Sequence, residues 1–137
     1  MDLPPGWPPE IGVAPRSTLR LPPAEDLTPL LSHLAGRGDL LVVCPTAVEV
    51  RNALAALRSV GVRAVVHPDG WAAAAAGPTG VGPRRAVFAP MPHLAAIVVV
   101  DEHDEALQGE GSPTWHAREV AFERGRRRRV PVILTSP

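Results

Sequence analysis

The sequence predicts an α/β fold in which helices cover both faces of one parallel sheet. Short apolar runs of strand length alternate with segments of helical period along the chain. Such alternation is typical of parallel strands joined by right-handed crossovers. The runs 40–44 (LLVVC) and 97–100 (IVVV) consist entirely of apolar residues, as expected of strands buried on both faces. We therefore expect a three-layer αβα lobe.

The composition indicates one small globular domain and limits the ways in which it could bind nucleic acid or zinc. The chain has 137 residues, 45% of them hydrophobic and 20% charged, which suits one domain with a modest core. Its net charge is zero and its 14 basic residues are all arginine, so any nucleic-acid binding has to come from local patches. The single cysteine, Cys44, excludes an internal disulfide and a cysteine-rich zinc site, and its apolar surroundings predict a buried thiol.

The N-terminus carries prolines where a signal peptide would have a basic flank and an apolar stretch. No apolar run approaches the length of a membrane span. A cytoplasmic protein that does not contact membranes is the expectation.

The elements can be assigned in order. Residues 1–16 contain five prolines and predict an extended arm or linker, followed by the lobe at 17–137. A short strand is expected at 17–21, and a helix from about residue 28 to 37, with Thr28 as its cap.

A second helix follows the strand at 40–44. Thr46 and Glu49 have the T-x-x-E spacing of a capping box, which predicts a helix from there to about Val60. The remaining expected elements are a strand at 62–67, a helix at 69–76, a loop at 77–83, a strand at 85–89, a turn at 90–94, the strand at 97–100, a loop at 109–113, a helix at 115–128 and a strand at 130–135.

Acidic residues follow the apolar run that ends at Val100. In ATPases of this architecture the first acid after such a strand holds magnesium and the next polarises the attacking water. The candidate catalytic residues are therefore Asp101 and Glu102. A solvated loop is the alternative. A metal site formed by His103, Asp104 and His116 is a further alternative, although no known ligand spacing links these three residues.

The sequence contains no segment expected to bind the phosphates of ATP. Gly77, Gly80 and Gly82 superficially suggest a phosphate-binding loop, but Pro78 and Pro83 remove N–H donors that such a loop needs. The motif G-x-x-x-x-G-K-[ST] is absent, and so is the lysine that pairs with the transferred phosphate. We therefore expect no cofactor for this chain, and no metal unless Asp101 retains magnesium.

Two groups of arginines are candidates for contact with nucleic acid. One precedes the strand expected at 85–89, and the other lies at the end of the helix expected at 115–128. Phosphate contacts are one interpretation, and a solvated helix C-terminus stabilised by the helix dipole is the other. The candidate residues are Arg84, Arg85, Arg126, Arg127, Arg128 and Arg129.

Two phrases in the sequence resemble one protein family. The phrase R-x-A-V-F-A-P, followed by P-x-L and an apolar strand that ends in D-E, spans residues 84–102. The phrase P-x-[YW]-H-A-R-[DE]-V-A-x-x-R spans residues 113–124. Together with LVVCP at 41–45 and VPVILTSP at 130–137, they resemble the replication-restart helicases called PriA, or primosomal protein N-prime. The resemblance covers about residues 20–137.

This resemblance implies an incomplete RecA-like lobe of the P-loop NTPase type, with Asp101 and Glu102 as a DExD/H-like box. It also implies that the strand at 130–135 lies beside the strand at 97–100. Family members are ATP-dependent 3′–5′ DNA helicases that use ATP and magnesium. Here LRLPPAEDLTPLL, at 19–31, stands in the place of the phosphate-binding loop, and the acidic box is one residue shorter.

The family's zinc cysteines, second ATPase lobe and N-terminal DNA-binding domain have no counterpart in this sequence. The expected function is therefore that of a degenerate primosomal protein with a vestigial box. It would act in replication restart by binding DNA, as forks or single strands, or primosome proteins, without helicase turnover. Two alternatives stay open: a helicase module that is active only with the missing segments or another chain, and a non-functional fragment of a split reading frame.

Overall fold

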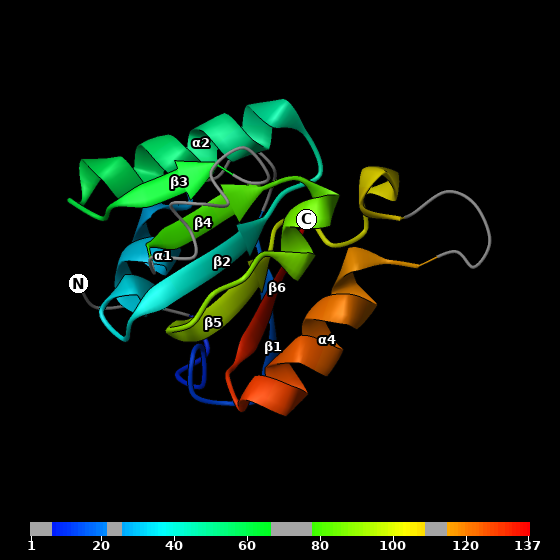
Figure 1. Cartoon of the computed structure of the whole chain (residues 1–137). Helices are drawn as coiled ribbons and strands as arrows, with labels where there is room; N and C mark the ends of the chain where they lie inside the picture. The colour runs from blue at the N-terminus through cyan, green and yellow to red at the C-terminus, as the bar shows by residue number, and fades with distance from the viewer. Residues whose placement is uncertain (1–6, 22–25, 67–77, 109–114) are drawn as a thin grey trace.

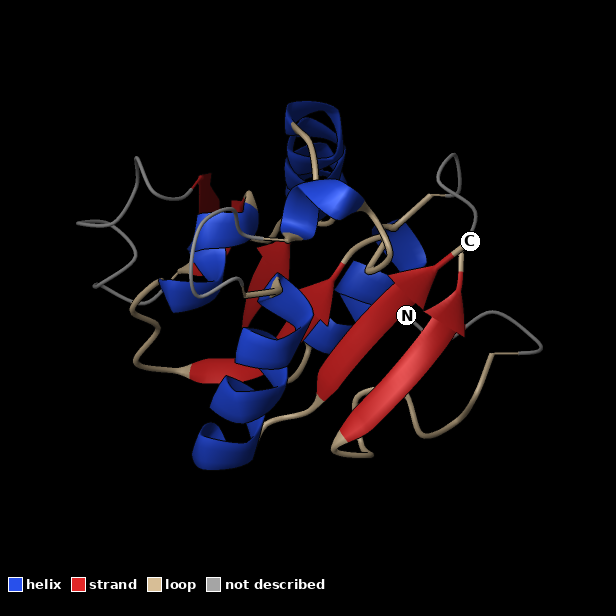
Figure 2. Cartoon of the chain, turned by 90° about the vertical axis from the view of Figure 1, so that its right-hand side faces the viewer, coloured by secondary structure: helices blue, strands red, loops and turns tan. Residues whose placement is uncertain are grey.

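A computed structural model describes residues 7–21, 26–66, 78–108 and 115–137. These residues form one six-stranded sheet in which every pairing is parallel, with the strand order β1-β6-β5-β2-β4-β3. Helices lie on both faces of the sheet (Figures 1 and 2). The α/β prediction and its RecA-like, three-layer form are confirmed.

The helices are α1, α2, α4 and the two short 3₁₀ helices η1 and η2. In chain order the elements are β1 (Arg16–Arg20), α1 (Thr28–Ala35), β2 (Asp39–Val43), α2 (Ala47–Ser59), β3 (Ala64–Val66), β4 (Thr79–Gly82), η1 (Arg84–Phe88), β5 (Leu94–Val99), η2 (Glu105–Leu107), α4 (Ala117–Arg128) and β6 (Val132–Ser136). Among the described residues, none of the helices is long and apolar enough to cross a membrane.

The two central strands, β2 and β5, divide the core into two halves. Because side chains alternate across a strand, Leu40 and Val42 pack with α1 and α2 on one face. Leu41 and Val43 pack with η1 and α4 on the other. All four are fully buried, which explains why the apolar run at 40–44 has no polar alternation. Cys44 is buried as predicted.

The position of β6 confirms a specific expectation. It pairs with β5 through Ile97↔Val132 and Val99↔Leu134, although α4 separates the two strands in sequence. Its other edge pairs with β1, and β1 has no second neighbour in the described part of the sheet.

The capping box that opens α2 is confirmed, with Thr46 and Glu49 bonded in both directions. The predicted start of α1 is corrected. Thr28 is the first helical residue and not the cap, and Leu27 occupies the cap position. The Asp26 carboxylate accepts hydrogen bonds from both the backbone N–H and the hydroxyl of Thr28, at 2.9 and 2.6 Å. The Asp26 carboxylate, two residues upstream, therefore provides the hydrogen bonds at the start of the helix that were expected from the Thr28 side chain.

Two assignments between residues 77 and 89 were wrong. Thr79–Gly82, expected in a loop, is the buried strand β4 between β2 and β3. Pairing on both edges overrides the low strand propensity of glycine. Residues 85–89, expected to be a strand, belong to η1, which buries Ala86 and Val87. The predicted helix at 69–76 and loop at 109–113 lie outside the described residues.

The segment before β1 is described from Trp7 onward, and it packs against the lobe. Ile11 is fully buried in the α1–α2 half of the core, and Trp7 packs against the same half. The Arg37 guanidinium donates a 2.5 Å hydrogen bond to the Gly12 carbonyl. These residues form turns, so this part of the proline-rich segment is held by the core.

Candidate functional site

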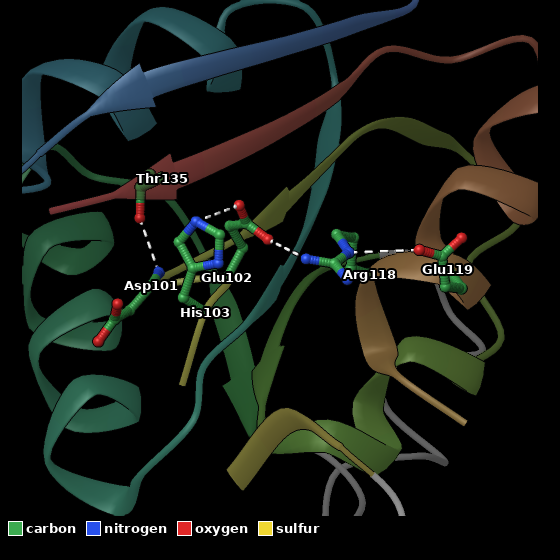
Figure 3. A network of polar contacts seen from close by, with 6 residues as sticks. All are labelled: Asp101, Glu102, His103, Arg118, Glu119 and Thr135. Carbon is green, nitrogen blue, oxygen red and sulfur yellow. Dashed lines mark hydrogen bonds and ion pairs between the residues drawn. The ribbon is translucent and has the colours of Figure 1, made fainter. Parts of the chain in front are cut away.

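The acidic box lies at the carboxyl end of β5, beside the ends of β2 and β6. Thr135 of β6 fixes the backbone of the loop. Its hydroxyl accepts from the Asp101 N–H at 2.8 Å, and its carbonyl accepts from the Glu102 N–H at 2.9 Å. The Val100 N–H donates to the Val43 carbonyl of β2. Three strands therefore determine where the two acids point (Figure 3).

Asp101 has a strained backbone conformation and surroundings that are unfavourable for its charge. Its φ of +51° lies in the left-handed region, which aspartate tolerates better than most residues. Partial burial is the largest cause that raises the pKa of its carboxyl, followed by the charges of Asp104 and Glu49. No basic side chain in the described ranges forms an ion pair with it. The surroundings of Asp101 therefore disfavour the charged form of its carboxyl.

Glu102 is in the opposite situation. Its side chain is only 8% exposed, and its two oxygens are bound by the Arg118 Nη1, at 2.6 Å, and the His103 Nε2, at 3.0 Å. Figure 3 shows Glu102 between these two partners. The hydrogen bond to Glu102 is the main cause that raises the pKa of Arg118. Each oxygen of Glu102 therefore already has one partner, and little of its side chain is exposed to water.

His116 is the residue that places Arg118. It is the N-cap of α4, and its Nδ1 accepts a hydrogen bond from the Arg118 backbone N–H at 2.9 Å. Burial, and next the charge of Arg118, lower the pKa of His116, which favours the neutral ring that can accept this bond. Sequence reasoning missed this role, although a polar residue directly before the helical period of 117–128 was a usable signal.

The alternative metal site is not assembled. His103 pairs with Glu102, and His116 caps α4. The Asp104 carboxylate accepts from the Ala106 N–H and so caps η2. In the described portion of the chain, no three histidine, cysteine or acidic side chains are arranged to hold a metal ion. The structure thus places His103, Asp104 and His116 in three separate roles.

Among the residues that the structure describes, those at this edge of the sheet do not fit a magnesium–nucleotide complex. Of the two acids in the box, Asp101 alone has a carboxylate outside an ion pair. The chain has no lysine to meet a phosphate. Gly80 and Gly82, the remaining part of the superficial phosphate loop, pair with Leu41 and Val43 inside the sheet. Their N–H groups therefore do not form a loop around a phosphate.

The candidate nucleic-acid arginines lie in two places. Arg84 is at the carboxyl end of β4, where it donates to the Gln108 carbonyl at 2.6 Å and lies over the Trp115 ring at 5.3 Å. Arg85 beside it is exposed. The other group lies in the last turn of α4 and at its C-cap.

The arginines at the end of α4 differ from one another. Arg126 and Arg127 both pair with Glu123, at 2.7 and 2.8 Å, which lowers the pKa of Glu123 to about 2. Arg128 donates to the carbonyls of the turn before β5. Arg129 is the left-handed C-cap of the helix, with φ of +56°, and is exposed. Unlike Arg126 and Arg127, it forms no ion pair with a described residue.

An all-parallel αβα lobe with an acidic loop behind a central strand is the architecture of a RecA-like ATPase lobe. Curated relatives specify the family. The chain is 47% identical over 57 residues to "Replication restart protein PriA" of Chlamydia pneumoniae, covering 41% of this chain and 8% of that protein. The corresponding protein of Bacillus subtilis is 41% identical over 56 residues, 41% of this chain and 7% of the relative.

A longer match is to "Probable replication restart protein PriA" of Mycobacterium tuberculosis, 33% identical over 98 residues, which are 70% of this chain and 15% of that protein. A scan against protein-family models finds no match. The chain is a partial PriA-like member. It spans less than a sixth of the length of these relatives.

Proposed function

We propose that this chain acts in DNA replication restart by binding DNA, as a degenerate PriA-like lobe without nucleotide turnover. The observation that carries the proposal is the state of Glu102. In an active lobe this position polarises the attacking water, and here Arg118 and His103 bind both of its oxygens. The names of the relatives support the role in replication restart.

Binding of a primosome protein is a second candidate, favoured by one surface. Phe88 is 55% exposed and makes an edge-to-face contact with Trp115 at 5.2 Å. It borders a largely apolar groove of about 510 Å³ between η1 and α4. A large exposed aromatic beside such a groove is typical of a protein-binding surface.

The third candidate, an active helicase module that needs further segments or another chain, requires ATP to bind. Charge-assisted hydrogen bonds contribute about 1.5–3 kcal/mol each, and the described lobe supplies no lysine for them. We therefore expect calorimetry with Mg²⁺-ATP to show no binding tighter than about millimolar. Micromolar binding would contradict the proposal and support the helicase module.

DNA binding is tested by anisotropy with a labelled single strand and a labelled fork at several salt concentrations. Arginine–phosphate contacts release counterions, so the log–log slope should be about −0.7 per contact on single strands. Replacing Arg126 to Arg129 with serine should flatten the slope. Binding with an unchanged slope would assign these arginines to solvent, and the absence of binding by the unaltered chain would reject the DNA proposal.

A further inference from the structure

A hollow of about 380 Å³ lies at the amino end of the sheet, where β1 and β6 begin beside the last turns of α4. Its lining is largely apolar, with contributions from Val13, Phe122 and Pro131. Its charged lining residues are three arginines, Arg16, Arg126 and Arg129, and no carboxylate is among the described residues that line it. A hollow with a largely apolar lining and a cationic rim favours a ligand that is both planar and anionic.

The arginines around this hollow differ in accessibility. Arg126 is already paired with Glu123. Arg16 and Arg129 are both exposed, and neither forms an ion pair in the described structure. The Arg16 guanidinium lies over the Phe122 ring, 4.0 Å from its centroid. Phe122 is thus covered on one face, and the plane left for stacking is that of Arg16 itself.

The edge strand β1 extends this cationic rim. Arg16, Thr18 and Arg20 alternate on one face of the strand and are exposed, whereas Leu19 between them is buried. Arg16 and Arg20 are four residues apart, which is about 13 Å along a strand. That separation is too large for one phosphate group and suits a chain of them. Figure 2 shows β1 at the margin of the sheet, without a helix over its outer edge.

We infer that this hollow takes one base of single-stranded DNA, stacked on the Arg16–Phe122 pair, with neighbouring phosphates on Arg129 and Arg20. Guanidinium and aromatic planes stack bases of any sequence, and a basic groove follows the backbone. An acidic peptide would satisfy the arginines but would leave the stacking plane unused. The inference rests on the proposed DNA binding and gives it a location: the base lies at the amino end of β1 and β6, and the strand runs along β1 toward Arg20.

The test compares a labelled oligo-dT of fifteen nucleotides (about one site size) with an abasic strand that has the same number of phosphates. The unaltered chain should bind oligo-dT at least about fivefold more tightly than the abasic strand, because stacking contributes only when bases are present. The Arg16→Gln variant should lose most of that preference. The Arg129→Asn variant, in which asparagine suits the left-handed backbone, should mainly reduce the salt slope.

The matched control is Arg51→Gln. Arg51 is exposed on α2, on the other side of the sheet, and the substitution removes the same charge. Its affinity for both strands should equal that of the unaltered chain. Because Arg16 is exposed, Arg16→Gln should keep the unaltered melting temperature, and a melting curve on each variant verifies this.

Four results would overturn the inference. Equal binding of the two strands by the unaltered chain would mean that no base is stacked. Preserved oligo-dT preference in Arg16→Gln would place DNA elsewhere and leave the proposed function standing. Displacement of oligo-dT by poly-glutamate, but not by the abasic strand, would assign the hollow to an acidic protein partner. Failure of the unaltered chain to bind either strand would reject the proposed function together with the inference.

Discussion

At the scale of the residue, the charge of Asp101 is expected to lower the stability of the folded state. Its backbone is left-handed and its carboxyl is partly buried beside other acids, which raises its pKa. Asparagine keeps the side-chain shape, loses the charge and is among the residues best suited to positive φ. We predict that Asp101→Asn leaves the free energy of unfolding unchanged or raises it by up to about 1 kcal/mol, as for a partly exposed charge.

The pH dependence of this effect has a definite sign. Because the folded-state pKa of Asp101 lies above the ordinary aspartate value of 3.8, its charge costs stability above the folded pKa, and the cost disappears as the pH falls below 3.8. Urea titrations of both proteins should therefore converge in acid and diverge toward neutral pH. A lower stability of Asp101→Asn at neutral pH would show that the carboxylate has a stabilising partner.

The pair formed by Glu102 and Arg118 makes a different prediction, because it is largely buried. Arg118→Gln leaves Glu102 with its contact to the His103 ring alone, and should lower the unfolding free energy by about 1–3 kcal/mol, the cost of a lost hydrogen bond to a buried charge. Adding Glu102→Gln to that variant should recover part of the loss. A double-mutant cycle measures the coupling, and a coupling near zero would show that the pair contributes nothing to stability.

At the scale of the element, α4 depends on its histidine cap. The pKa of His116 is lowered below 6.5 mainly by burial. The stability that the neutral ring contributes is therefore complete above pH 6.5 and lost as the pH falls through the folded pKa. We predict that His116→Asn, which keeps a cap without a titrating group, loses less stability than the unaltered chain over that range. His116→Ala should cost about 1 kcal/mol at neutral pH.

The control for the cap is the difference between the two substitutions. If His116→Asn and His116→Ala are equally destabilised at pH 8, the hydrogen bond to Arg118 contributes nothing. If the unaltered chain and His116→Asn lose stability in parallel as the pH falls, the ring does not titrate in this range.

The elements also show which parts of the structure were predictable from sequence. β2 and β5 were found because fully buried strands are apolar throughout, and α2 because its capping box is local. β4 was missed because Thr79–Gly82 has almost no side chains to pattern, and its strand state depends on β2 and β3. For the site, the positions of Asp101 and Glu102 followed from the strand pattern. The engagement of Glu102 by Arg118 depends on a tertiary contact across sixteen residues, which a pattern does not reveal.

At the scale of the whole molecule, the net charge is zero, but the exposed charged side chains are unevenly distributed. The acidic loop follows the carboxyl end of β5, and exposed Arg16 and Arg129 lie at the amino end of the sheet. Asp101, which forms no ion pair with a described residue, repels a phosphate backbone, whereas Arg16 and Arg129 attract it. This asymmetry favours DNA contact away from the edge where ATPases of this architecture do their chemistry.

Magnesium tests whether that edge retains any of its chemistry. A ligand raises the melting temperature only if it binds the folded state, and Asp101 is the one box acid outside an ion pair. We predict no increase in melting temperature with magnesium chloride, relative to sodium chloride of equal ionic strength. The Arg118→Gln variant, which removes the cation from Glu102, should be the most sensitive to magnesium. A clear stabilisation of the unaltered chain that is lost in Asp101→Asn would show that the box holds metal, and it would revive the helicase module.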